Sequence, residues 1–212
     1  MSLEMDAGFE RVVIVVQARM SSKRLPRKVL LPLGQSTVID TVIARAGMAR
    51  TCDALVVAVP DSPTDDELEA YLVSSGIKVF RGPENDLISR IFQAADVEKA
   101  SQVVRVTADC PLVDPSVIDE VVQLHKSSSA QLTVNYAPPT FPDGLDVACL
   151  EMDLLAELMA RNLAPHDREH VTTIVERNPQ EFRLMNLLAE KDESGRRWTL
   201  DNREDLTFLR QV

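Results

Sequence analysis

Short β-branched apolar runs recur along the chain, and each interval between them is long enough for one helix. The runs occupy residues 11–18, 54–59, 77–80 and 102–106. Continuous apolar runs of this length are typical of strands that are buried on both faces, as in parallel sheets. Stretches with helical spacing lie between and after them, at residues 37–50, 63–74, 87–97 and 115–125. This alternation predicts an α/β fold with a doubly wound, mostly parallel sheet.

The regular alternation ends after residue 126. We expect further strands at residues 132–135, 145–150, 182–188 and 198–200, and helices at residues 151–162, 165–177 and from 203 onward. No low-complexity linker and no internal repeat separates these pieces. We therefore expect one domain over residues 10–212, in which the irregular part supplies contacts to an acceptor.

Composition excludes several classes of protein. A net charge of −10 argues against a general nucleic-acid binder, which carries a basic face. No apolar run approaches the roughly 20 residues of a membrane span, and residues 1–10 do not resemble a signal peptide. Three widely spaced cysteines without metal-ligand spacing indicate reduced thiols, and hence a cytoplasmic protein.

A basic loop follows the first predicted strand. It carries Arg19, Lys23, Arg24, Arg27 and Lys28 without a single acid. Ligands of open α/β sheets bind at the carboxyl ends of strands, and arginine holds phosphate bidentately. The loop contains no glycine, so it is neither a Walker loop nor a G-x-G-x-x-G turn. Charge alone leaves two interpretations open, a phosphate site and a solvated basic loop.

Five motifs in this chain resemble those of a known family in the same order. They lie at residues 18–28, 105–115, 142–147, 167–172 and 198–206. The first has Ala18, Arg19, Ser22, Arg24, Leu25, Pro26 and Lys28 at the matching positions. The set is similar to that of the sugar-activating cytidylyltransferases. These include CMP-KDO synthetases, acylneuraminate cytidylyltransferases and the family named after spore-coat polysaccharide biosynthesis protein F.

The resemblance implies a nucleotide-diphospho-sugar transferase-like fold, which is Rossmann-like and of the GT-A type. It implies transfer of CMP from CTP to an acidic sugar of the ulosonic acid type, with release of pyrophosphate, in surface polysaccharide biosynthesis. It further implies Mg²⁺ as the cofactor and a homodimer, to which residues 132–177 contribute contacts.

The resemblance also assigns roles to individual residues. The predicted catalytic residues are Arg19, Lys28 and Asp109, and the predicted metal ligands are Asp109 and Asp201. The nucleotide-binding residues are Ala18, Arg19, Ser22, Arg24, Lys28 and Arg81, with the base read near Ala18 and residues 81–86. The acceptor-binding residues are Asp143, Asp146 and His170. Arg105, at the end of the fourth strand, either helps at the base or forms a structural salt bridge.

The physical chemistry of the two metal candidates agrees with these roles. Asp109 follows a buried strand, so its carboxylate is expected at the strand's carboxyl end, and Asp201 follows a short predicted strand. Two carboxylates and phosphate oxygens form a typical Mg²⁺ site. The alternative for either residue is a helix cap.

Three positions depart from the family pattern. Relatives usually have glycine where Ser21, Arg27 and Ala108 stand. A side chain at Arg27 either crowds a triphosphate or adds a charge contact to it, and we expect the charge contact.

Three other functions compete with this interpretation. One is a transferase that uses another nucleoside triphosphate on the same fold. The second is a glycosyltransferase, which characteristically has an Asp-x-Asp metal motif; the nearest acids, Asp61, Asp65 and Asp66, lie on what we expect to be a surface helix. The third is a non-catalytic nucleotide-binding homologue.

Overall fold

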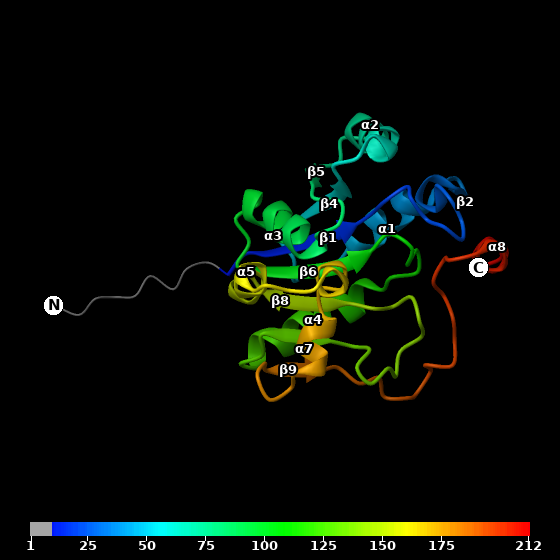
Figure 1. Ribbon diagram of the computed structural model, residues 1–212. Helices are drawn as coiled ribbons and strands as arrows, with labels where there is room; N and C mark the ends of the chain where they lie inside the picture. The colour runs from blue at the N-terminus through cyan, green and yellow to red at the C-terminus, as the bar shows by residue number, and fades with distance from the viewer. Residues whose placement is uncertain (1–9) are drawn as a thin grey trace.

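A seven-stranded sheet runs through the centre of the computed structural model, which describes residues 10–212 (Figure 1). In chain order its strands are β1 (Val12–Gln17), β4 (Ala54–Pro60), β5 (Val79–Gly82), β6 (Gln102–Thr107), β7 (Leu132–Val134), β8 (Ala148–Glu151) and β9 (Leu184–Asn186). Their spatial order is β5-β4-β1-β6-β8-β7-β9, with β8 antiparallel to both of its neighbours and the other pairs parallel. The predicted mostly parallel α/β sheet is confirmed. The segment in which we expect no signal peptide lies, except for Glu10, outside the described residues.

Helices cover both faces of this sheet, because β1 alternates its side chains between two hydrophobic cores. The helices are α1 (Val38–Ala46), α2 (Asp66–Ser74), α3 (Leu87–Val97), α4 (Pro115–Ser127), α5 (Met152–Ala160), α6 (Pro165–Glu169), α7 (Thr173–Arg177) and α8 (Arg203–Leu209). Val12, Ile14 and Val16 share a core with α1, α2 and α4. Val13 and Val15 share the other core with α3, α5 and α7. The winding is therefore double, as the apolar runs predict. No helix in residues 10–212 is long and apolar enough to span a membrane.

The sheet changes direction of winding at β1. From β1 the chain first adds β4 and β5 on one side of β1, and it then returns to add β6 on the other side. Such a switch point leaves a crevice outside the carboxyl ends of the two strands. A small third core, formed by Leu25, Leu33, Val38, Leu200, Leu206 and Leu209, fastens α8 beside the loop that follows β1. The hairpin of β2 (Pro32–Leu33) and β3 (Ser36–Thr37) belongs to the same end of the molecule (Figure 1).

The single helix predicted over residues 165–177 is wrong. The chain forms α6 and α7, with a break at residues 170–172. Val171 is fully buried in the core, and the Thr172 hydroxyl accepts a hydrogen bond from the Tyr136 hydroxyl at 3.1 Å. The helix is interrupted where these two side chains turn toward the sheet, a tertiary preference that helical spacing does not contain.

Two predicted strands also differ from the structure. The strand expected at residues 145–150 is shifted to β8, because buried Asn135 holds the backbone before it: its amide donates to the Leu145 carbonyl and accepts from the Val147 N–H, both at 2.8 Å. Residues 198–200 form no strand. They instead make single backbone hydrogen bonds, from Trp198 N to Asp143 O at 2.6 Å and from Leu200 N to Asp109 O at 2.7 Å.

Asn135→Ala is expected to lower the free energy of unfolding by about 2–4 kcal/mol, because two buried backbone groups lose their partners. Urea denaturation followed by circular dichroism measures this. Asn178→Ala is the control, since the amide of Asn178 makes one side-chain hydrogen bond, to the Ile174 carbonyl. Equal losses for the two variants would show that Asn135 does not hold the segment before β8.

Candidate functional site

A cleft of about 760 Å³ opens at the carboxyl ends of β1 and β6. Its walls come from the loop after β1, the loop after β6, and the segments around residues 143–146, 169–170 and 199–201. A smaller cavity of about 210 Å³ shares part of its lining. The cleft therefore lies at the switch point of the sheet, where ligands of such folds bind.

The loop after β1 is held in place by hydrogen bonds. Met20 N donates to Asp65 Oδ1 at 2.7 Å, and Asp65 is fully buried. Arg27 N donates to the Met20 carbonyl at 3.1 Å, which closes the loop upon itself. Leu25 N donates to Ser22 Oγ at 3.3 Å. Asp65, which we expected on a surface helix, is thus a buried acceptor that fixes the basic loop.

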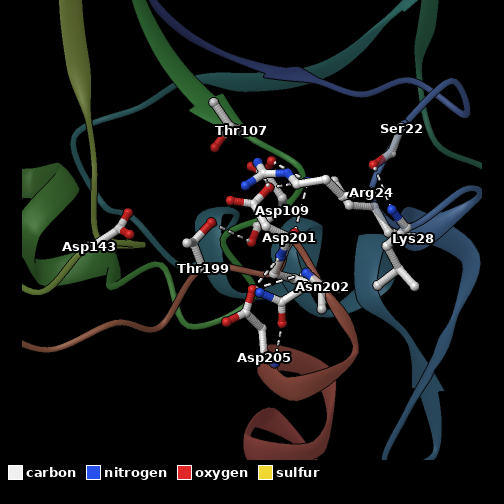
Figure 2. A network of polar contacts seen from close by, with 12 residues as sticks. Ser22, Arg24, Lys28, Thr107, Asp109, Asp143, Thr199, Asp201, Asn202 and Asp205 are labelled. Atoms are coloured by element: carbon white, nitrogen blue, oxygen red, sulfur yellow. Dashed lines mark hydrogen bonds and ion pairs between the residues drawn. The ribbon is translucent and has the colours of Figure 1, made fainter.

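Lys28 joins three distant parts of the chain. Its side chain is 11% exposed, and its Nζ donates to Asp109 Oδ2 at 2.7 Å, to the Leu200 carbonyl at 2.8 Å and to Asp201 Oδ1 at 3.0 Å (Figure 2). A nearly buried ammonium is stable only with such acceptors around it. The two predicted metal ligands therefore lie side by side, with a lysine between them.

Asp201 is surrounded by cations. Besides Lys28, it pairs with Arg24 at 2.7 Å and with Arg197 at 2.9 Å. Burial alone would raise the pKa of Asp201, but the hydrogen bonds from Lys28 and Arg197 together hold the pKa below its ordinary value. Asp201 is thus fully ionised at neutral pH. It precedes α8, whose first turn Asn202 and Asp205 close with reciprocal side-chain hydrogen bonds to the backbone (Figure 2).

Asp109 keeps one free carboxylate oxygen. Its Oδ2 is bound by Lys28, whereas its Oδ1 has only a 3.8 Å contact with Cys110 Sγ within the described chain.

Asp143, by contrast, is bound at 2.6 Å by Arg197. Glycine is required beside it: Gly144 has a φ of +109°, and a Cβ there would meet Thr199 N at 2.6 Å. The segments 142–147 and 198–206 therefore meet backbone to backbone.

Asp146 has an unusual environment. It lines the cleft and makes no side-chain hydrogen bond within residues 10–212. Burial raises the pKa of Asp146 to about 6, and the Asp143 carboxylate adds to that effect while Arg105 opposes it. A carboxylate of this kind is partly protonated near neutral pH and can exchange hydrogen bonds with a polar ligand.

The structure brings most of the predicted site residues together in the cleft. Those that line it are Ala18, Arg19, Ser22, Arg24, Lys28, Asp109, Asp143, Asp146, His170 and Asp201. The exception is Arg81. Its guanidinium binds Asp66 at 2.6 Å and Glu69 at 2.7 Å on α2, and it does not line the cleft. The chemical roles that the sequence assigns to all of these site residues remain predictions.

Arg90 is a buried, charged residue of the cleft that the sequence prediction missed. It is 5% exposed, and it donates to the Pro83 carbonyl at 2.6 Å while its Nε has no partner in the described chain. It thereby holds the loop before α3, where Arg81 was expected to act. A signal existed in the sequence: Arg90 is a lone cation in the apolar stripe formed by Leu87, Ile88, Ile91 and Ala94.

The structure gives the guanidinium of Arg27 a protein partner and leaves the expected charge contact with a triphosphate untested. The side chain is 58% exposed and pairs with Glu67 of α2, outside the cleft. Its backbone is left-handed, with a φ of 62°. Within residues 10–212, Arg27 and Lys99 are the only residues other than glycine with a positive φ. Among Ser21, Arg27 and Ala108, only Arg27 therefore adopts a backbone conformation that favours glycine.

Comparisons with known proteins agree with this geometry. Residues 13–210 match the family model described as "Cytidylyltransferase". The chain is 33% identical over 208 residues to spore coat polysaccharide biosynthesis protein SpsF of Bacillus subtilis, covering 95% of this chain and 85% of that protein. It matches a cytidylyltransferase structure from Leptospira borgpetersenii with a TM-score of 0.91 at 34% identity, covering 95% and 86% of the two chains. A CMP:2-keto-3-deoxy-manno-octonic acid synthetase solved with CTP shares the fold, with a TM-score of 0.70 at 16% identity over 95% and 97% of the chains.

Two arginines of the basic loop provide a matched test of the cleft. Arg24→Ala is expected to weaken pyrophosphate binding about tenfold, because a charged hydrogen-bond donor that lines the cleft is lost. Arg27→Ala should change the affinity less than about twofold, since its guanidinium lies on Glu67. Calorimetric titration with inorganic pyrophosphate checks both, and a larger loss for Arg27→Ala would contradict the structure.

The raised pKa of Asp146 predicts a pH-dependent stability. The folded protein retains a proton that the unfolded chain, with an ordinary pKa of 3.8, releases. This contribution is complete below the unfolded pKa and is lost as the pH rises through about 6. Asp146→Asn removes it, so the loss of unfolding free energy between about pH 5 and about pH 7.5 should shrink by about 1.4 kcal/mol. Urea denaturation at the two pH values measures this, with Asp153→Asn, a change at an exposed carboxylate of α5, as the control. An unchanged pH dependence would place Asp146 in water.

Proposed function

This chain belongs to the cytidylyltransferase family, and from that premise we propose that it transfers CMP from CTP to an acidic sugar in surface polysaccharide biosynthesis. The observation that supports the proposal most is the cleft itself, in which Arg19, Arg24 and Lys28 face Asp109 and Asp201. Three cations and two carboxylates in one cleft suit a nucleoside triphosphate with a divalent metal ion.

In the proposed reaction an acceptor hydroxyl releases its proton to water, and its oxygen bonds to the α-phosphorus of CTP. The bond from that phosphorus to the bridging oxygen breaks, and pyrophosphate leaves. Arg19 and Arg24 bind phosphate oxygens, and Ser22 donates a hydrogen bond. Lys28 stabilises negative charge as it develops on the phosphates, and its three acceptors hold it ready for that role. Such a transfer is catalysed mainly by positioning and electrostatics.

The donors in the cleft fit Mg²⁺. No group of three or more His, Cys, Asp or Glu residues in the described part of the chain could hold a metal alone. Mg²⁺ needs fewer protein ligands, because it takes one or two carboxylates together with phosphate oxygens and water. Asp109 has the free oxygen for this role, and Asp201 would join it when Arg24, which lines the cleft, turns to the phosphates. Bound there, the ion would neutralise phosphate charge.

The acceptor would lie on the opposite side of the cleft from the basic loop. Asp143, Asp146 and His170 form that side, and they offer acceptors and a donor for sugar hydroxyls. The acidic character of the sugar is supported by the relative whose structure contains CTP, which is described as a synthetase for a keto-deoxy-octonic acid.

A cytoplasmic homodimer completes the proposal. Free thiols at Cys52, Cys110 and Cys149 suit a reducing compartment, where CTP is made. For the dimer, β9 leaves one edge of the sheet unpaired within the described residues, and Met185 and Leu188 near it are 39% and 59% exposed. Residues 132–177 build the neighbouring strands and helices.

Pyrophosphate release from each of the four common nucleoside triphosphates, with Mg²⁺ and a panel of ulosonic acids, tests this function. We expect turnover with CTP and at least one acid, and a loss of more than about 100-fold for Asp109→Asn. The variant keeps the shape of the side chain but loses the negative charge beside the Lys28 ammonium, so its unfolding free energy should fall by about 1–3 kcal/mol while the protein stays folded. Turnover with another nucleotide would transfer the proposal to a different base. Nucleotide binding without turnover for any acid would favour a non-catalytic homologue.

A further inference from the structure

A recess of about 210 Å³ branches from the cleft beneath α7. Arg105, Thr107 and Asp146 line both cavities, so a ligand in the recess reaches the cleft. Tyr136, Thr172, Thr173 and Glu176 form the rest of its polar wall. The recess lies on the face of the sheet where β6 otherwise presents Val103 to a hydrophobic core. A polar pocket at this position interrupts an apolar face of the sheet. The fold does not require this interruption.

Arg105 is the unusual group in this recess. It lies opposite Val15 of β1 and Ala148 of β8, in the interior of the sheet. Its Nε donates to Gln17 Oε1 at 2.7 Å, and its terminal nitrogens form no hydrogen bond and no ion pair anywhere in residues 10–212. The structural salt bridge that the sequence left open is therefore not formed.

Other arginines of the described chain that lie partly inside the protein do have partners. Arg168 pairs with Asp86 at 2.7 Å, and Arg45 donates to the Val113 carbonyl at 2.8 Å. A guanidinium without such partners destabilises the folded protein, because part of its hydration is lost without compensation. Gln17 fixes the Nε side of Arg105, so the fork of terminal nitrogens stays oriented. That fork matches a carboxylate.

A second unsatisfied group belongs to a residue in the wall of the recess. Glu176 Oε1 is buried and has no hydrogen-bond partner in the described chain. It lacks one donor, and a hydroxyl or amino group of a sugar supplies one. A sugar acid offers both a carboxylate for Arg105 and hydroxyl or amino donors for Glu176.

We propose that this recess is the subsite for the acidic end of the acceptor: Arg105 binds the carboxylate of a sugar acid, and Glu176 accepts from a hydroxyl or amino group of the same molecule. This inference rests on the proposed function, and it identifies the residue that selects an acid over a neutral sugar. Gln17 is a positioning residue, because it acts through Arg105.

Arg105→Met tests the inference, because the change removes the charge and keeps most of the side-chain length. In urea denaturation the variant should lose less stability than a variant of a paired arginine, because the terminal nitrogens of Arg105 have no hydrogen-bonded acceptor within residues 10–212 and interact with Asp146 only through space. Arg161→Met is the control: Arg161 is paired with Glu157 and Glu181, and its loss should reduce stability. A loss of stability for Arg105→Met as large as that of the control would mean that Arg105 is structural, and would overturn the inference.

Ligand binding provides the second measurement. We expect wild-type protein with CTP to bind 3-deoxy-manno-octulosonate or its 8-amino-8-deoxy analogue at least about tenfold more tightly than the methyl ester of the same sugar. Arg105→Met should bind acid and ester equally, and its affinity for CTP should stay within about twofold of the wild type. A preserved preference for the acid in Arg105→Met, or no binding of either acid to the wild type, would overturn the inference.

Pyrophosphate release separates this inference from the proposed function. If the wild type binds an acid through Arg105 and yet releases no pyrophosphate, the proposed function fails and the subsite stands. If wild type and Arg105→Met release pyrophosphate with equal acceptor KM, the subsite fails and the proposed function stands.

Discussion

The ammonium group of Lys28 is the contact on which the cleft depends. It lies between the carboxylates of Asp109 and Asp201 and also binds a backbone carbonyl, so it ties the loop after β1 to the loop after β6 and to the start of α8. Without a cation between them, two carboxylates so close together would repel each other. Charges of both signs are therefore already assembled around the position at which we propose that the phosphates bind. Polar groups that are fixed in this way need little reorganisation during a reaction, and this is the usual origin of electrostatic catalysis.

Short-range patterns in the sequence predicted the parts of the molecule that local physics controls. Buried β-branched runs identified β1, β4 and β6, and the acid-free loop after β1 identified one wall of the cleft. The errors arise where long-range packing decides. The break between α6 and α7 depends on the burial of Val171, and no spacing within the segment indicates it. The sequence placed Arg81 in the cleft, whereas the structure has Arg90 there, and this error has the same origin. Acids on α2 bind Arg81, and the apolar face of α3 carries Arg90 into the cleft.

The basic loop contains no glycine. Ser21 has a negative φ, whereas Arg27 adopts a left-handed backbone and turns its side chain to Glu67. The loop keeps its shape because buried Asp65 accepts from Met20 and because Arg27 N closes onto the Met20 carbonyl. Its rigidity thus comes from hydrogen bonds and not from backbone freedom. The remaining cations are left on the side of the loop that faces the cleft.

The positions of the three partners along the chain have a consequence for the order of folding. Lys28 and Asp201 are separated by 173 residues, and their contact requires the sheet from β1 to β6 and the small core under α8 to exist first. Contacts this distant in sequence close late, because the entropy of a long loop must be overcome before they contribute. During refolding, the strands and helices therefore assemble before the cleft is complete. Until then Lys28 and both carboxylates remain hydrated, so a partly folded chain has the secondary structure of an enzyme without its binding site.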